Sequence, residues 1–179
     1  PELAAEMAWR DAAISHVKNG IYGEMFVAAM LAAAAVNENI VQVIEAGLSE
    51  IPETSRLYEA IQKILAMYSD GASEEAVFAE IHRQYDEYTP HGWCHTIPNA
   101  MIVAAALLYG HGDYGRTICM AVQTGFDTDC NGATAGSVLG MIKGIDSIPE
   151  YWKETMPEPL HTSIFQVGPI RISDGVKKT

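Results

Sequence analysis

Cysteine is scarce in this 179-residue chain. Three cysteines occur, Cys94, Cys119 and Cys130, and they lie far apart in the sequence. An odd number at such spacing argues against the dense disulfide framework that stabilises small secreted domains. We therefore expect a protein of the reducing cytoplasm whose stability rests on a hydrophobic core. With 49% hydrophobic residues, the chain is long enough to bury such a core.

Basic residues are also few. The chain has 11 Lys and Arg against 23 Asp and Glu, which gives a formal net charge of −12. A nucleic-acid-binding surface normally carries a basic patch, so this balance argues against a nucleic-acid partner. It does not exclude an anionic small ligand, because a divalent cation or a helix N-terminus can reverse the sign of the charge locally.

Long hydrophobic runs are absent, and no signal peptide is visible. The most apolar stretch, residues 25–36, is rich in alanine and too short to span a bilayer, so we expect no membrane association. The chain begins at Pro1 and enters a helical pattern at once. This start is compatible with processing and equally with the removal of an upstream segment.

Helical periodicity runs through nearly the whole chain. The helix expected over residues 21–36 is apolar all round, and such a helix lies at the centre of a bundle. Residues 165–173 partly alternate and favour a short strand, whereas residues 175–179 favour disorder. The absence of a repeat or a linker indicates one all-α domain. The other helices are expected over residues 2–17, 39–46, 53–68, 73–85, 98–109, 113–123, 129–143 and 148–154.

Local signals predict how several of these helices pack, begin and end. In the first helix, Leu3 and Met7 belong to an apolar stripe at helical spacing, and Asn19-Gly20 is expected to stop that helix. Ser73 and Asp113 are expected to cap the helices that follow them. A cation followed by glycine, Lys143-Gly144, is the stop signal of the last strong helix.

Two closely spaced aspartates are the chemically most informative feature. Asp127 and Asp129 stand two positions apart before a predicted helix, with Gly125 ahead of them. In a turning backbone, carboxylates at i and i+2 can converge on one point, and two such oxygen ligands suit Mg²⁺ or Mn²⁺. The simpler alternative is that Asp129 caps the helix and Asp127 forms the turn, which is the commoner meaning of an isolated pair.

A longer run around the aspartates distinguishes these alternatives. Residues 125–140, Gly-Phe-Asp-Thr-Asp-Cys-Asn-Gly-Ala-Thr-Ala-Gly-Ser-Val-Leu-Gly, resemble the C-terminal signature of the ADP-ribosylglycohydrolase family nearly position by position. Residues 99–114 resemble the penultimate helices of that family. Residues 15–26, Ser-His-Val-Lys-Asn-Gly-Ile-Tyr-Gly-Glu-Met-Phe, resemble its central histidine segment. The resemblance covers most of residues 1–144.

The resemblance implies a multi-helix orthogonal bundle with two Mg²⁺ ions. Such a protein hydrolyses the glycosidic bond of an ADP-ribosyl group carried by a protein or by a small conjugate. Asp127 and Asp129 match the C-terminal metal ligands of the family. Cys130 stands where the family usually has Thr, which implies a softer third ligand for Mg²⁺. Four residues match the region that lines the substrate cleft: His16, Asn19, Tyr22 and Gly23.

The other metal ligands of the family lie in an N-terminal half, in a Gly-Asp-containing first helix and a Thr-Asp-Asp-Thr run. This chain has neither, and its own acidic pairs, Glu74–Glu75 and Asp86–Glu87, lack the right surroundings. We therefore expect residues 1–179 to be the C-terminal part of one domain, incomplete at its N-terminus, without a catalytic residue and inactive alone. The alternative is a non-catalytic ADP-ribose-binding or structural relative.

An incomplete bundle also predicts exposed apolar surface. The helix over residues 21–36 is expected to lack partners. The face formed by Gly132, Gly136 and Gly140, spaced for close helix approach, is expected to lack them too. Such surface favours self-association or a tightly held second fragment.

Two further motifs are given ordinary structural roles. His91, Cys94 and His95 are too crowded for the usual tetrahedral zinc site, so a covering loop is the better interpretation. Residues 110–115 match G-x-G-x-x-G literally, but they follow a helix and not a strand, which indicates a helix–helix turn and no dinucleotide site.

Overall fold

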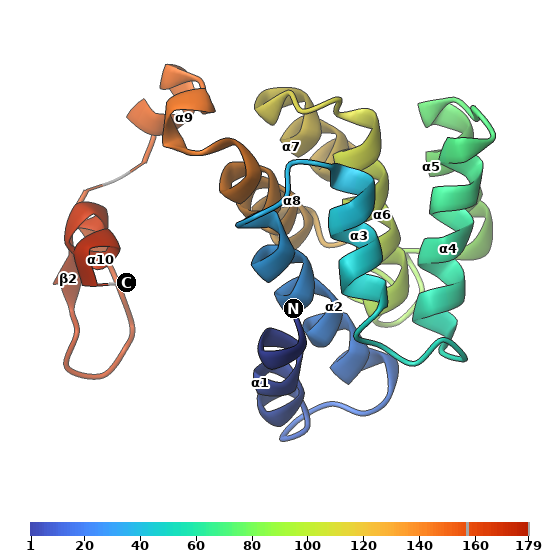
Figure 1. Ribbon diagram of the computed structural model, residues 1–179, viewed down its shortest axis with the longest axis horizontal. Coiled ribbons are helices and arrows are strands. Elements are labelled where there is room, and N and C mark those ends of the chain that lie inside the picture. Colours follow the sequence, from blue (N-terminus) through green and yellow to red (C-terminus); the bar gives the residue numbers. More distant parts are fainter. Residues whose placement is uncertain (157, 179) are drawn as a thin grey trace. The chain divides into compact units, whose positions relative to one another are not determined.

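A computed structural model describes residues 1–156 and 158–178. The chain forms two compact units, residues 1–147 and 148–179. The larger unit is entirely helical within its described residues, and the predicted all-α class is confirmed (Figure 1). Its elements are α1 (Glu2–Ala12), α2 (Asn19–Ala34), α3 (Ile40–Leu48), α4 (Arg56–Ser69), α5 (Glu74–Gln84), α6 (Thr96–Tyr109), α7 (Tyr114–Gln123), α8 (Thr128–Lys143) and a 3₁₀ turn (Ile145–Ser147).

Local capping explains where several helices begin and end. Side chains accept a hydrogen bond from a backbone N–H in the first turn of α3, α4, α5 and α7, which satisfies a donor that has no partner inside the helix. The capping residues are Asn39, Ser55, Ser73 and Asp113. The predicted caps Ser73 and Asp113 are confirmed, as is the stop of α8 at Gly144, whose φ of 74° suits glycine.

The first predicted helix is wrong at its end and in its buried face. It ends at Ala12 instead of continuing to residue 17, and Asn19 opens α2 instead of ending the preceding helix. The buried side of α1 carries only alanines, whereas its large apolar residues Leu3 and Met7 are 68% and 63% exposed. Small side chains allow α1 to pack closely on α2, and the distance between packed helices depends on the side chains at their contact.

The core of this unit is built around α6. Every residue of α6 from Ala100 to Tyr109 is buried, and the helix packs against α2, α3, α4, α5, α7 and α8. The second central helix is α2, which contacts α1, α3, α4, α6 and α8, so its predicted central place is confirmed. The largest fully buried side chains on these two helices are Phe26, Met30, Ile97, Met101, Ile102 and Leu107.

The glycine face of α8 is covered within the chain. A Cβ at Gly132 would lie 2.9 Å from Cγ2 of Val122, and one at Gly136 would lie 3.3 Å from Cδ1 of Ile118, so α7 occupies this face. The expectation that this face lacks a partner is therefore wrong at Gly132 and Gly136.

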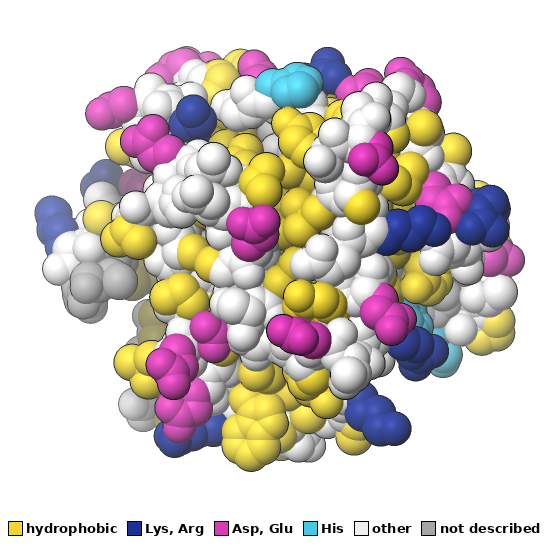
Figure 2. All heavy atoms as spheres, turned by 45° about the vertical axis from the view of Figure 1, so that its right-hand side comes forward, with side chains coloured by type: hydrophobic (Ala, Val, Ile, Leu, Met, Phe, Trp, Pro, Cys, Tyr) yellow, Lys and Arg dark blue, Asp and Glu magenta, His cyan; other side chains and the backbone are white. Residues whose placement is uncertain are grey.

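Charge on the larger unit is mostly acidic and dispersed. In the face shown in Figure 2, acidic side chains lie scattered among hydrophobic ones, and the basic side chains lie mostly toward its edges. None of the helices in the described part of the chain combines the length and hydropathy needed to cross a bilayer.

The smaller unit contains α9 (Glu150–Glu154), a two-stranded antiparallel ladder and α10 (Ile172–Lys178). Strand β1 (Leu160–His161) pairs with β2 (Pro169–Ile170), with Leu160 opposite Ile170. The strand expected in residues 165–173 is confirmed only over these two β2 residues. The expectation of disorder is wrong for residues 175–178, which lie in α10, and Thr179 lies outside the described residues.

Candidate metal site

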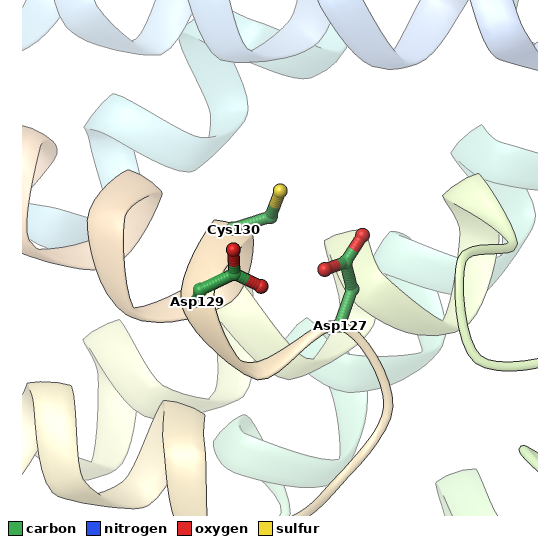
Figure 3. Close-up of side chains that lie close together, drawn as sticks. All are labelled: Asp127, Asp129 and Cys130. Atoms are coloured by element: carbon green, nitrogen blue, oxygen red, sulfur yellow. The ribbon is translucent and has the colours of Figure 1, made fainter.

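Three donor side chains come together where α8 begins. Asp127 precedes the helix, and Asp129 and Cys130 lie in its first turn, so their side chains are directed toward a common region (Figure 3). One carboxylate oxygen from each aspartate and Sγ of Cys130 all lie within 4.8 Å of one another. Asp127 is partly buried, whereas Asp129 and Cys130 are exposed. The three residues assigned to metal binding from the sequence are thus brought together.

The alternative that Asp129 caps the helix is wrong, although Asp127 does lie in the turn before α8. Asp127, and not Asp129, occupies the N-cap position of α8, and within the described residues its side chain makes no capping hydrogen bond. Asp129 lies inside the helix, where its negative charge suits the positive end of the helix dipole. Since neither carboxylate serves as the expected cap, both are available to a ligand beside the helix.

The pKa values of Asp127 and Cys130 are both raised above their ordinary values. Burial raises the pKa of Asp127 and the neighbouring Asp129 carboxylate raises it further, although a hydrogen bond from the Cys130 thiol acts in the opposite direction. Partial desolvation raises the pKa of the Cys130 thiol, although the residue is exposed overall, and the negative charge of Asp127 raises it further. A divalent cation would reverse these effects, because it favours the deprotonated form of every ligand. Two carboxylates fit Mg²⁺ or Mn²⁺, whereas the thiol fits a softer ion better.

The turn before Asp127 has an unusual backbone. Gly125 has a φ of 89° and Phe126 a φ of 59°, so two successive residues are left-handed. Glycine adopts this conformation freely, but a phenylalanine there costs roughly 1–3 kcal/mol. Such strain persists only where the surroundings hold the chain in place. The Phe126 side chain is buried, and its ring centroid lies 5.2 Å from that of His82 on α5.

Two residues near the end of α5 hold this turn through its backbone. Oε2 of Glu87 accepts a hydrogen bond from the Phe126 N–H at 2.7 Å. Nε2 of His82 lies 2.9 Å from the carbonyl oxygen of Thr124. The left-handed turn is therefore fixed from α5 and from the segment that follows it.

Asn99, in α6, holds the other side of the turn. Its Oδ1 accepts from the Asp127 N–H at 3.1 Å and from Nδ2 of the buried Asn131 at 2.7 Å. Its Nδ2 is placed by the carbonyl oxygens of Trp93 and His95, each at 2.9 Å. The Asn99 side chain thus links the loop before α6, the turn and α8 by hydrogen bonds. It orients Asp127 through the backbone N–H of that residue.

The positioning roles of Asn99 and Glu87 are not evident from the sequence. Asn99 lay inside a segment that resembles the family, but only as part of a helix, and Glu87 was set aside as part of an acidic pair. The one local sign of a role for Asn99 is that it is a polar residue in the first turn of a mostly apolar helix.

Gly23 lies beside the metal donors. Together with Gly20 it lines a groove of about 320 Å³ that also includes Cys130, Asn99 and Asn131. Residues from α2, α6 and α8 therefore meet at this groove. Of the four residues expected to contact substrate, Gly23 is the one that the structure places next to Cys130.

Of the remaining three residues, Asn19 and Tyr22 lie elsewhere, whereas His16 lies against Gly20, which lines the groove: a Cβ at Gly20 would lie 3.0 Å from Cβ of His16. Asn19 and Tyr22 line a different pocket, and Oδ1 of Asn19 accepts from the Leu57 N–H at 3.1 Å, which satisfies a donor at the start of α4. His16 is exposed, with Nδ1 2.7 Å from Oγ of Ser15.

Gly23 also has a packing role that can be measured. A Cβ at this position would lie 2.4 Å from Cγ2 of Thr96, so Gly23→Ala should lower the free energy of unfolding by about 1–3 kcal/mol. Adding Thr96→Ser removes the clashing methyl group and should recover most of that loss, whereas Thr96→Val keeps a methyl group and should not. Urea denaturation of the three variants measures this, and an unchanged Gly23→Ala protein would refute the close contact.

The two other motifs have structural roles. His95 caps α6 through Nδ1, which accepts from the Ile97 N–H at 3.3 Å, and its ring stacks on Tyr85. Within the described residues, His91, Cys94 and His95 do not form a metal-ligand cluster. Residues 110–115 join α6 to α7, as the helix–helix turn prediction requires.

The structure is that of an all-α protein with a candidate divalent-cation site. Two carboxylates and a thiol converge there, at the start of α8. Comparison with protein families matches residues 1–173 to the ADP-ribosylglycohydrolase family, and the chain belongs to that family of hydrolases. The match extends beyond residues 1–144, to which the sequence resemblance was confined. Searches of curated proteins and of solved structures returned no match.

Proposed function

We propose that this chain supplies a divalent-cation site for hydrolysis of the glycosidic bond of ADP-ribosyl groups. Asp127, Asp129 and Cys130 hold the ion, with Mg²⁺ or Mn²⁺ as the cation. The convergence of their ligand atoms within 4.8 Å, with no capping hydrogen bond to Asp127 among the described residues, carries the proposal. Its substrate is an ADP-ribosylated protein or a small ADP-ribose conjugate, as family membership suggests.

The groove beside Cys130 is the place for the reacting sugar. When bound, the cation supplies charge stabilisation and activates water for attack on the anomeric carbon. Gly20 and Gly23 line this groove without side chains, so a ligand can approach the backbone of α2 closely. Asn131 and Thr134 lie on the α8 side of the groove and offer polar groups to ribose hydroxyls.

Three donors fill only part of a metal coordination shell. Mg²⁺ demands near-ideal octahedral geometry, which needs more ligands than these three side chains offer. Among the described residues, a cluster of three such donors occurs once, at the start of α8. The remaining positions must be filled by water, by substrate or by carboxylates of another polypeptide segment. We therefore infer that residues 1–179 alone bind one ion weakly and do not turn over substrate.

The sulfur at position 130 allows a sharp test of the site. In calorimetric titrations the chain should bind Mg²⁺ weakly and the softer Cd²⁺ more tightly, because a thiolate prefers soft ions. Cys130→Thr should reverse this preference, since a hydroxyl oxygen suits Mg²⁺ better. Cys119→Thr, at an exposed cysteine on α7, is the matched control and should leave both affinities unchanged.

The same titrations distinguish the alternatives. Absence of binding for every divalent ion would overturn the metal site and favour a non-catalytic relative. Tight binding of two ions, or release of ADP-ribose from an ADP-ribosylated peptide by the isolated chain, would overturn the inference that this polypeptide holds only part of the centre.

A further inference from the structure

Two cations without an acidic partner lie at the start of α2 and of α4. Residues 1–147 contain seven Lys and Arg side chains, and four of them form ion pairs: Arg10, Lys63, Arg83 and Arg116. Lys18, Arg56 and Lys143 form none with any described residue. Two of these three cations, Lys18 and Arg56, line the same pocket.

That pocket has a volume of about 290 Å³ and is lined by polar groups. Besides Lys18 and Arg56, the hydroxyl-bearing residues Tyr22, Thr54 and Ser55 line it, and none of the described acidic residues does. Oγ of Ser55 accepts from the Tyr58 N–H at 3.1 Å, so its own proton remains available to an acceptor. The lining therefore offers positive charge and hydroxyl donors together.

The positions of Lys18 and Arg56 at two helix N-termini add to the positive electrostatic potential in the pocket. Lys18 is the N-cap residue of α2 and Arg56 is the first residue of α4, so each lies at the positive end of a helix dipole. Two of the free amides of α4, those of Leu57 and Tyr58, already donate to Asn19 and Ser55. An anion in this pocket would thus be held chiefly by side chains, with the dipoles as background.

Lys18 also has a strained backbone. Its φ of 49° and ψ of −118° lie where glycine is favoured and a lysine is rare. Glycine at this position would relieve the strain, so the lysine costs folding free energy. Strained residues of this kind are typical of ligand-binding positions.

We propose that this pocket binds the phosphate group of a small molecule, at a site separate from the metal groove. Two positive charges match the charge of a phosphate monoester near neutral pH, which is about −1.5 to −2. The volume lies at the lower end of small-molecule sites, roughly 300–1,000 Å³, so the pocket accommodates a phosphate with few attached atoms. The pocket and the groove have no lining residue in common, although Asn19 of the pocket and Gly23 of the groove lie one helical turn apart on α2.

Titration of inorganic phosphate, followed by calorimetry without divalent cations, tests this directly. Arg56→Gln should weaken binding about tenfold, the loss expected for one charge-assisted hydrogen bond. Lys18→Gly should weaken it similarly while raising the melting temperature, which separates loss of binding from loss of folding. Lys143→Gln removes the same charge from α8, outside the pocket, and should leave the affinity unchanged.

Several outcomes would overturn the proposal. The first is absence of phosphate binding. The second is that Lys143→Gln weakens binding as much as Arg56→Gln, which would show that only the overall charge of the protein matters. The third is loss of binding in Asp127→Asn, which would place the phosphate at the metal donors. Because the measurement contains no divalent cation, failure of the metal proposal does not affect it.

Discussion

Asp127→Asn should abolish divalent-cation binding and, in the same protein, raise the melting temperature of the metal-free form. The first effect follows because Asp127 is one of two carboxylates within 4.8 Å of each other and of Cys130, and an amide carries no charge for the cation. Mutation of a residue that only hydrogen-bonds to a metal ligand already lowers metal affinity by about 10–100-fold. Loss of a direct ligand should therefore lower the affinity by more than roughly 100-fold.

The second effect follows from the direction of the pKa change. The Asp127 pKa is raised above its ordinary value of 3.8, first by burial and then by Asp129, so the folded protein favours the protonated carboxyl. Stability of the metal-free protein therefore falls as the pH rises from below 3.8 through the raised pKa. At neutral pH the ionised Asp127 destabilises the fold, and the asparagine removes that penalty.

Thermal unfolding over a pH series checks both effects. The gain in melting temperature for Asp127→Asn should be present at pH 7 and should shrink below pH 3.8, where the native carboxyl is protonated. Added Mg²⁺ or Mn²⁺ should raise the melting temperature of the unmodified chain but not that of the variant. Asp146→Asn, at an exposed aspartate of the 3₁₀ turn, is the control for net charge. A fall in the melting temperature of metal-free Asp127→Asn would contradict the argument.

Among the proposed substitutions at the candidate site, Asn99→Leu should lower the free energy of unfolding most. Leucine leaves the Asp127 N–H and Nδ2 of the buried Asn131 without their acceptor, and it leaves two carbonyl oxygens without their donor. An unsatisfied buried donor costs about 1–3 kcal/mol, so a loss of about 3 kcal/mol in unfolding free energy is expected. Metal affinity should fall as well, because the turn that presents Asp127 is no longer held from α6.

A second substitution separates the hydrogen bonds that Asn99 accepts through Oδ1 from those that it donates through Nδ2, which together form its hydrogen-bond network. Asn99→Asp keeps an oxygen that accepts from Asp127 and Asn131, but it loses the N–H groups that face the Trp93 and His95 carbonyls. It should therefore destabilise less than Asn99→Leu. Urea denaturation gives the unfolding free energies, and calorimetry with Mn²⁺ gives the affinities. A loss under about 1 kcal/mol for Asn99→Leu would show that the network does not hold the turn.

Local signals allowed much of the fold to be predicted from sequence. Ser73 and Asp113 were identified as caps and Gly144 as a stop, because each acts on backbone groups within four residues of itself. Metal binding by the two aspartates is a prediction that rests on the long run around them, since their spacing alone does not distinguish a ligand pair from a cap. The structure supports the ligand interpretation by leaving Asp127 without a capping bond to any described residue.

The residues that shape the site could not be found in this way. Asn99 reaches Asp127 across 28 residues and His82 reaches Thr124 across 42, and no periodicity encodes such pairs. The buried face of α1 was mistaken for the same reason. Leu3 and Met7 form the stronger apolar stripe, but which face is buried depends on what α2 offers, and the alanine side fits closely.

By itself, the sequence determined the helical class, most helix ends, the family and the two aspartates at the start of α8. Three features are visible only in the folded structure: α6 is the most enclosed helix, α7 covers Gly132 and Gly136 of α8, and the groove at Gly23 and the pocket at Lys18 have no lining residue in common. Helix formation and capping depend on neighbours a few residues away, so they can be read along the chain. Packing partners and pockets depend on contacts between distant segments, which exist only once the chain has folded.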